Sequence, residues 1–119
     1  MNAIEKKSLN NPDETRRFPK GQLELVTLDG VTFGKATFQP GWKWTEAMPA
    51  IAKTATCQAA HNNYVISGRM HVKMDDGTEK EYGPGDVGII PPGHDAWVVG
   101  NEPCVLIDFN GMTHYAEKH

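Results

Sequence analysis

Residues 82–100, YGPGDVGIIPPGHDAWVVG, contain two short β-prone segments joined by a stiff turn that ends at His94. Residues 83–85, Gly-Pro-Gly, favour a sharp turn, since glycine tolerates backbone angles that other residues avoid. Residues 91–93, Pro-Pro-Gly, fix a second turn. The stretch therefore predicts two strands with a histidine near the start of the second.

The same texture extends over most of the chain. Asp29-Gly30 separates QLELVTL from VTFGKATF, and an Asp-Gly pair between β-rich runs is a strong hairpin signal. A second Asp-Gly pair follows RMHVKM, in which Met70, Val72 and Met74 alternate with polar residues. No stretch keeps a helical apolar period. These patterns predict an all-β, antiparallel sandwich or small barrel with little helix.

Composition narrows the classes of function. The 119 residues fit one domain, and 12 Lys plus Arg against 15 Asp plus Glu give a net charge of −3. We therefore expect binding neither to nucleic acid nor to a membrane. The polar start without an apolar signal region predicts a cytoplasmic protein. In that compartment Cys57 and Cys104 are expected as reduced thiols, although the spacing leaves a bridge between them open.

The chain is expected to divide into three parts. Residues 1–20 are polar and contain two prolines, which predicts an arm that pairs with a partner subunit. Residues 21–112 hold the β-rich segments and form the barrel domain. Residues 113–119 form a polar tail.

The order of these signals resembles the two motif regions of the cupin superfamily, over about residues 33 to 109. Gly85, Pro91 and Gly93 match the second motif, and Gly68 matches the last glycine of the first motif. The resemblance implies a cupin-like double-stranded β-helix, the jelly-roll barrel.

The metal-ligand positions of the cupin motifs are only partly kept. The glutamate position of the first motif holds His61, and its two histidine positions hold Ala55 and Cys57. The histidine position of the second motif holds Ala96, and His94 stands two residues earlier. The resemblance thus names a scaffold and leaves the reaction open.

Cys57, His61 and His94 are the candidate metal ligands. Cys57 and His61 are four residues apart and His94 shares parity with Ala96, so all three can face the interior if they lie on strands. One thiolate and two imidazoles suit a divalent transition metal (zinc, iron or nickel) and leave a coordination position open. In the alternative, Cys57 is a small buried hydrophobe and the pocket is empty or holds an organic ligand.

The expected pocket has a lining as well as ligands. Trp42 and Trp44 precede the first motif, and the resemblance to cupins places them near the barrel mouth, where they pack in the core, form a dimer contact or line the ligand pocket. The further expected lining residues are Glu46, which is also a fourth candidate ligand, Tyr64 and Ala96. Asp95 is a candidate acceptor that orients the His94 imidazole.

Two functions follow, and the enzyme status stays open between them. The first is a cupin barrel that handles a small molecule at a central metal, in a dioxygenase, isomerase or lyase type of reaction. The second is a metal-free barrel that binds or senses a small ligand without turnover. In either case an open sheet edge, together with the analogy to cupins, predicts a homodimer.

Overall fold

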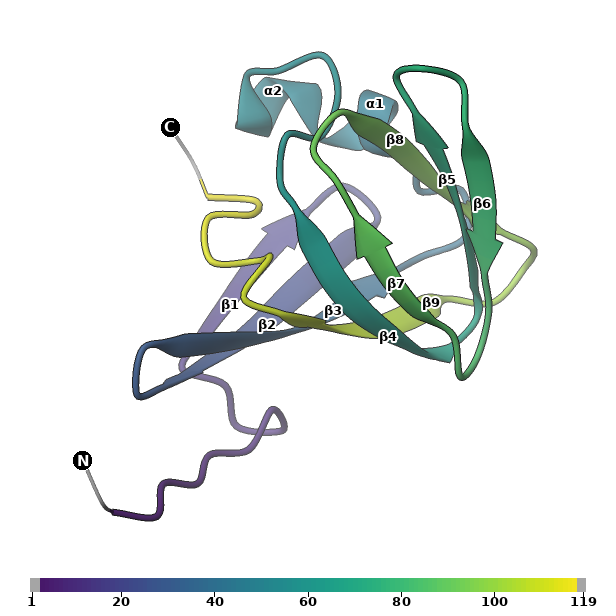
Figure 1. Ribbon diagram of the computed structural model, residues 1–119. Coiled ribbons are helices and arrows are strands. Elements are labelled where there is room, and N and C mark those ends of the chain that lie inside the picture. The colour runs from purple at the N-terminus through teal and green to yellow at the C-terminus, as the bar shows by residue number, and fades with distance from the viewer. Residues whose placement is uncertain (1–2, 118–119) are drawn as a thin grey trace.

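A computed structural model describes residues 3–117 of the chain. The described part forms nine strands and two short helices (Figure 1). In chain order the elements are β1 (Glu14–Phe18), β2 (Gly21–Leu28), β3 (Val31–Phe38), α1 (Trp44–Ala47), α2 (Pro49–Ala52), β4 (His61–Ser67), β5 (Arg69–Met74), β6 (Glu79–Tyr82), β7 (Val87–Ile90), β8 (His94–Val99) and β9 (Cys104–Phe109).

The strands form two antiparallel sheets. One sheet has the order β1-β2-β3-β9-β4-β7 and the other has the order β6-β5-β8. All seven strand pairings are antiparallel, which confirms the predicted all-β class with little helix. Some strands that are adjacent in the large sheet, such as β3 and β9, are far apart in the sequence, as in a jelly roll.

The two Asp-Gly pairs form the turns that the sequence predicts. Asp29 and Gly30 have φ angles of 48° and 80° between β2 and β3, and two successive positive φ angles are typical of the tight turn that joins twisted strands. Gly77 has a φ of 91° between β5 and β6. On β5, Met70 and Val72 are buried and Arg69 and Lys73 are exposed, as the alternation indicates.

The two helices lie together at one end of the sheets (Figure 1). Asp95 on β8 fixes α1 in place, because its carboxylate accepts hydrogen bonds from the Thr45 backbone N–H at 3.1 Å and from the Thr45 hydroxyl at 3.0 Å. Trp44 and Met48 from this region are buried and pack into the core. The helices thereby close the end of the barrel at which β4 and β8 begin.

The segments outside the barrel domain also contribute to the core. β1 pairs with β2 of the same chain, and Phe18 at its end is buried. The Phe18 ring lies 6.1 Å from the ring of Tyr115, which is buried near the C-terminus. Parts of the expected arm and of the expected tail therefore meet and pack against each other.

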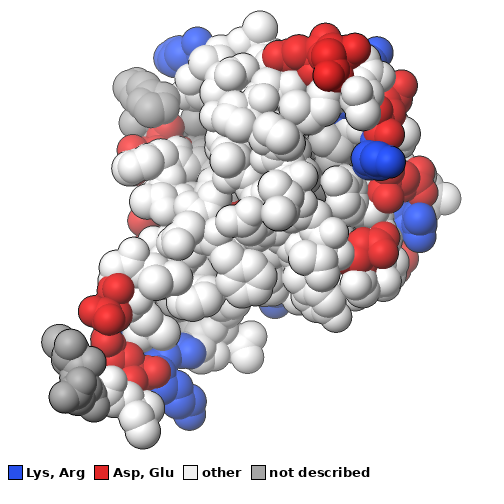
Figure 2. All heavy atoms as spheres, in the orientation of Figure 1, with Lys and Arg blue, Asp and Glu red and all other residues white. Residues whose placement is uncertain are grey.

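The outer face of the large sheet carries exposed apolar side chains. Val87 and Ile89 on the edge strand β7 are 75% and 78% exposed, and Tyr64 and Ile66 on β4 are 43% and 46% exposed. Figure 2 shows mostly uncharged residues over this front face, where β4 and β7 lie in Figure 1. In the described part of the chain, no helix has the length and apolar character needed to cross a membrane.

Candidate functional site

Three backbone segments bring Cys57, His61 and His94 together at the helix-covered end of the barrel. His61 and His94 are the first residues of β4 and β8. Cys57 lies in the loop after α2 and forms a bridge to β8: its N–H donates to the His94 carbonyl at 2.8 Å, and its carbonyl accepts from the Gly93 N–H at 2.7 Å. Cys57 and His61 therefore do not share a strand, and the bridge to β8 fixes the thiol.

The three side chains face one another. Cys57 Sγ lies 3.6 Å from His61 Nε2, and one donor atom from each of the three residues lies within 4.8 Å of the other two. The ring centroids of His61 and His94 are 5.3 Å apart. All three residues are at most 5% exposed, so the cluster is shielded from bulk water.

A second layer of hydrogen bonds orients both imidazoles. His61 Nδ1 lies 2.7 Å from Oδ2 of Asp108, which is fully buried on β9 and whose Oδ1 accepts from the Gly111 N–H at 2.9 Å. His94 Nδ1 lies 2.7 Å from the Pro91 carbonyl oxygen. Because a carbonyl only accepts, His94 carries its proton on Nδ1. In both rings Nε2 is the nitrogen left free toward the cluster.

The electrostatics favour a thiolate beside an imidazolium. Burial raises the pKa of the Cys57 thiol, but hydrogen bonds to His61 and His94 and the charges of these rings outweigh it and lower the pKa to about 6. Burial lowers the pKa of His61, but the hydrogen bonds and charges of Asp108 and Cys57 raise it to about 9. Cys104 has no such partners, and burial raises the pKa of its thiol to about 11.

These residues fit a transition metal ion. The donors are a thiol that ionises easily and two imidazole nitrogens, which are common ligands of zinc and other first-row metals. The carboxylate behind one imidazole and the carbonyl behind the other are the partners that metal-bound histidines usually have. Three protein ligands leave a coordination position for an exogenous group.

A cavity of about 420 Å³ adjoins the cluster on the side of Cys57. One of its walls comes from the helix region, with Trp44, Met48 and Ala52, and the floor is the loop that contains Cys57. The opposite wall is the C-terminal segment, residues 110–117.

A smaller cavity of about 40 Å³ lies on the barrel side of the cluster. His61, His94 and Trp42 line it, together with Asn63 on β4. Tyr115 lines both cavities, and its ring centroid lies 5.8 Å from the ring centroid of His61. Burial raises the pKa of the Tyr115 hydroxyl well above its usual value, and the negative charges of Cys57 and Asp108 add to this, so Tyr115 stays protonated.

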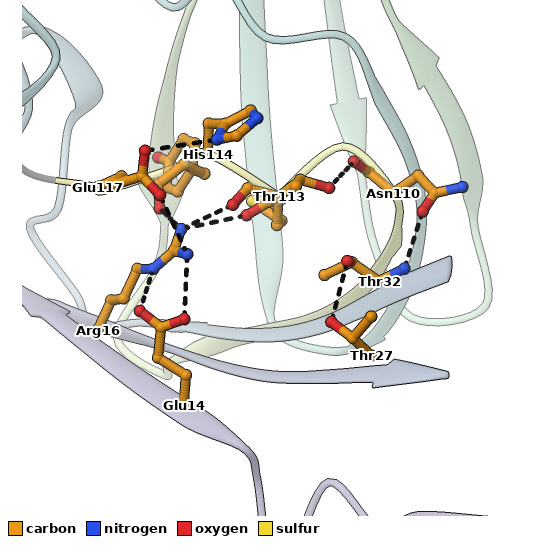
Figure 3. A network of polar contacts seen from close by, with 10 residues as sticks. Glu14, Arg16, Thr27, Thr32, Asn110, Thr113, His114 and Glu117 are labelled. Atoms are coloured by element: carbon orange, nitrogen blue, oxygen red, sulfur yellow. Dashed lines mark hydrogen bonds and ion pairs between the residues drawn. The ribbon is translucent and has the colours of Figure 1, made fainter. Parts of the chain in front are cut away.

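Arg16 on β1 holds the C-terminal wall (Figure 3). Its Nη1 donates to the carbonyl oxygens of Tyr115 at 2.7 Å, Thr113 at 3.1 Å and Met112 at 3.5 Å. The carboxylate of Glu14 accepts from the same guanidinium at 2.8 and 3.2 Å, and Glu117 lies 3.6 Å from it. The wall of the cavity is thus fixed by the first strand of the chain.

The residues expected to line the pocket divide between several places. Trp42 and Ala96 line the small inner cavity, and Trp44 lines the outer one. Glu46 is exposed in a shallow surface hollow formed with Lys20 and Lys43, apart from the metal-ligand cluster. Tyr64 points outward, because strand alternation on β4 places its neighbours inside and Tyr64 on the solvent face.

The structure corrects the expected role of Asp95 and answers whether Cys57 and Cys104 are bridged. Asp95 does not orient His94, because its carboxylate accepts hydrogen bonds from Thr45. The Pro91 carbonyl oxygen accepts the hydrogen bond from His94 Nδ1 instead. Cys57 and Cys104 are both buried and free, so they form no bridge.

Two residues at the site, Asp108 and Tyr115, were not predicted from the sequence. Asp108 could have been found, because it shares parity with Cys104 and Leu106 in the apolar strand CVLIDF, and an acidic residue on a buried strand face needs a partner. Tyr115 gave no such signal in its polar segment.

The fold and the site define a class of protein: a single jelly-roll domain of the cupin type, with a Cys/His/His cluster that could hold a metal at one end. The chain belongs to the family of EutQ-like cupin domains, whose pattern it matches over residues 29–105. The resemblance to cupins is therefore confirmed. No functionally curated protein matches the sequence.

Solved structures with the same fold have diverse functions. A protein of unknown function from Rhizobium leguminosarum is 18% identical, with a TM-score of 0.64 over 90% of this chain and 95% of that one. The polyketide cyclase RemF from Streptomyces resistomycificus is 18% identical, with a TM-score of 0.63 over 90% and 78%. An oxalate decarboxylase from Lactobacillus farciminis is 18% identical, with a TM-score of 0.59 over 82% of this chain and 30% of that one. At these identities the similarity shows the shared fold.

Proposed function

We propose that this protein binds one divalent transition metal through Cys57, His61 and His94 and handles a small organic molecule in the adjoining cavity. The observation that carries the proposal is the orientation of the two imidazoles. Each histidine commits Nδ1 to a fixed acceptor, Asp108 or the Pro91 carbonyl, and keeps Nε2 for the cluster. This is the arrangement expected of metal-bound histidines.

Among the candidate metals, the donor set favours zinc over iron and nickel. A thiolate ligand is soft and suits zinc well, and a cysteine with histidines is found in catalytic zinc sites that keep one position open. A metal held by these residues would supply Lewis acidity. The protein would bind the molecule in the cavity of about 420 Å³, keep water out through burial of the cluster, and hold its ligands rigid through Asp108.

Metal analysis of protein purified without an affinity tag tests the proposal. We expect about one equivalent of metal in the wild type, and loss of that metal in His61→Ala and His94→Ala. Two matched controls are His71→Ala and Cys104→Ala. The ring of His71 stacks on the ring of Trp97 outside the cluster, with 4.7 Å between the ring centroids. Cys104 is the second buried cysteine and is not part of the cluster. Wild-type protein that holds no metal and gains none on titration with Zn²⁺, Fe²⁺ or Ni²⁺ would reject the proposal.

A metal-free binding protein is the second candidate, and the Cys57 contact favours it. The thiol and His61 lie at hydrogen-bonding distance, and Asp108 completes a chain of paired groups that needs no ion. In that case the cavity holds its ligand without turnover. Tight binding of a small molecule by fully chelated protein, at the same affinity as by metal-treated protein, would favour this second function.

A further inference from the structure

Residues 111–117 cover the candidate metal-ligand cluster. The three cluster side chains are at most 5% exposed, so an ion or a small molecule can reach them only if part of the chain moves. The backbone of residues 111–117 lies directly against the start of β4, because a Cβ atom added at Gly111 would collide with the Ala60 carbonyl oxygen and with Asp108 Oδ1. In the same segment Tyr115 is buried and lines both cavities. Movement of this segment would therefore uncover the cluster.

The backbone of this segment is weakly tied to the barrel. The segment belongs to no strand. In the described part of the chain its backbone–backbone hydrogen bonds are internal, from the Tyr115 N–H to the Met112 carbonyl and from the Glu117 N–H to the His114 carbonyl, both at 3.2 Å. A segment without ladder hydrogen bonds opens at a lower free-energy cost than a core strand.

One side chain holds this backbone from outside (Figure 3). Arg16 Nη1 donates to the carbonyl oxygens of Met112, Thr113 and Tyr115. Within residues 3–117, no other group outside the segment donates a hydrogen bond to the backbone of residues 112–117. The Glu14 carboxylate accepts from the same guanidinium and orients it. Loss of Arg16 would thus free the backbone while the buried side chains of the segment still favour closure.

The segment begins after a fixed residue and ends at a strained one. Asn110 is fixed to β3, because its N–H donates to the Thr32 carbonyl at 2.7 Å and its Oδ1 accepts from the Thr32 N–H at 2.9 Å. Gly111 follows, and glycine tolerates a wide range of backbone angles. Ala116 has a φ of 57°, a left-handed conformation that alanine keeps only where its surroundings enforce it. Arg16 contributes to this enforcement, since it binds the carbonyl of the preceding residue.

We infer that residues 111–117 form a lid over the cluster, that the lid pivots at Gly111, and that Arg16 is the latch that keeps it closed. Arg16 lines neither cavity beside the cluster, so it is a positioning residue that acts through the lid. Opening moves Tyr115 away from the cluster and makes Cys57 accessible. The inference rests on the proposed function in naming a metal ion among the species that pass the lid, whereas the lid itself is tested on metal-free protein.

The rate of thiol labelling in metal-free protein tests the lid. Every sample carries Cys104→Ala, so Cys57 is the only thiol. The reagent is the aromatic disulfide DTNB at about pH 8, where the Cys57 thiol, with a pKa of about 6, is ionised and the rate reports access. Arg16→Ala should react about 5- to 30-fold faster than the parent, the factor expected on losing roughly one charge-assisted hydrogen bond.

The matched control is Arg17→Ala on the same strand. The Arg17 guanidinium donates to the Gln22 side chain at 2.9 Å and contacts no residue of the lid. Its labelling rate should stay within about twofold of the parent. Arg16→Lys is a second variant in case Arg16→Ala does not fold. It keeps a positive charge but loses the planar guanidinium, so its rate should lie between those of the parent and Arg16→Ala.

Urea separates opening of the lid from unfolding of the whole domain. Opening of seven residues exposes little surface, so the labelling rate of the Arg16 variants should depend only weakly on low concentrations of urea. A dependence as steep as that of global unfolding would overturn the inference. Labelling within about twofold of the parent in every folded Arg16 variant would also overturn it.

Zinc release distinguishes the lid from the proposed function. From zinc-loaded protein, excess chelator should remove the metal faster in Arg16→Ala than in the parent, by a factor similar to that for labelling. If Arg16→Ala labels faster but no sample holds zinc, the proposed function is rejected and the lid stands. If zinc is bound but labelling is unchanged, the lid is rejected and the proposed function stands.

Discussion

Replacement of Asp108 by asparagine tests how the candidate metal site is held. Asp108 is fully buried, and its carboxylate contacts His61 Nδ1 at 2.7 Å and the Gly111 N–H at 2.9 Å. The asparagine side chain has nearly the same shape and can still accept one of these hydrogen bonds. The substitution thus removes the negative charge behind the imidazole while largely preserving the packing.

The size of the effect follows from the change in hydrogen-bond type. A hydrogen bond to a charged group contributes about 1.5 to 3 kcal/mol and a neutral one about 0.5 to 1.5 kcal/mol, so the difference between the middles of these ranges is about 1.3 kcal/mol. That difference corresponds to about a tenfold weaker affinity for zinc, since about 1.36 kcal/mol is one power of ten. Asp108→Ala also removes the group that orients the ring, and we expect about 100-fold weaker binding, the upper end of the range for such partners.

Competition with a chromogenic zinc chelator measures these affinities. The matched control is Asp86→Asn, because the Asp86 carboxylate accepts a hydrogen bond from the Gly83 N–H at 2.7 Å but contacts no histidine. We expect zinc affinity in this control to equal that of the wild type. If Asp108→Asn binds zinc within about twofold of the wild type, the carboxylate does not support the metal ligand and the reasoning fails.

Three further predictions concern the thiol, the C-terminal wall and the surface. In metal-free protein, Cys57 should react increasingly with iodoacetamide as the pH rises through about 6, because the lowered pKa of its thiol gives the reactive thiolate above that pH. Cys104 should stay unreactive below about pH 9, because burial raises the pKa of its thiol. Mass spectrometry measures the labelling, and equal labelling of the two cysteines would contradict this prediction. Arg16→Ala should lower the free energy of unfolding by about 1 to 2 kcal/mol, because the carbonyls of Met112, Thr113 and Tyr115 lose the Arg16 guanidinium as a donor. It should also speed amide hydrogen exchange over residues 112–117, and unchanged exchange would show that Arg16 does not hold this segment. We also propose that the expected homodimer forms through the exposed apolar face around Val87, because two copies of this largely uncharged face can pack against each other. Val87→Lys should then give monomers in sedimentation velocity. An unchanged sedimentation coefficient would reject this interface.

The sequence by itself determined the fold class. Short-range signals decide it: the Asp-Gly turns, the alternation on β5 and the Gly-Pro clusters act over a few residues, and each matches the structure. The parity of His94 with Ala96 also held, since both are buried on the inner face of β8. The sequence supplied Cys57, His61 and His94 as candidates, and their donor atoms lie within 4.8 Å of one another in the structure.

Only the tertiary structure decided how those ligands are supported and what lies beside them. His61 and Asp108 are 47 residues apart, and they meet because β9 inserts between β3 and β4 in the large sheet. Tyr115 reaches the site because Arg16, 99 residues earlier, holds its backbone. Such contacts depend on strand order and sheet packing, which local patterns do not encode, so the cavity and its walls emerge only when distant segments are brought together.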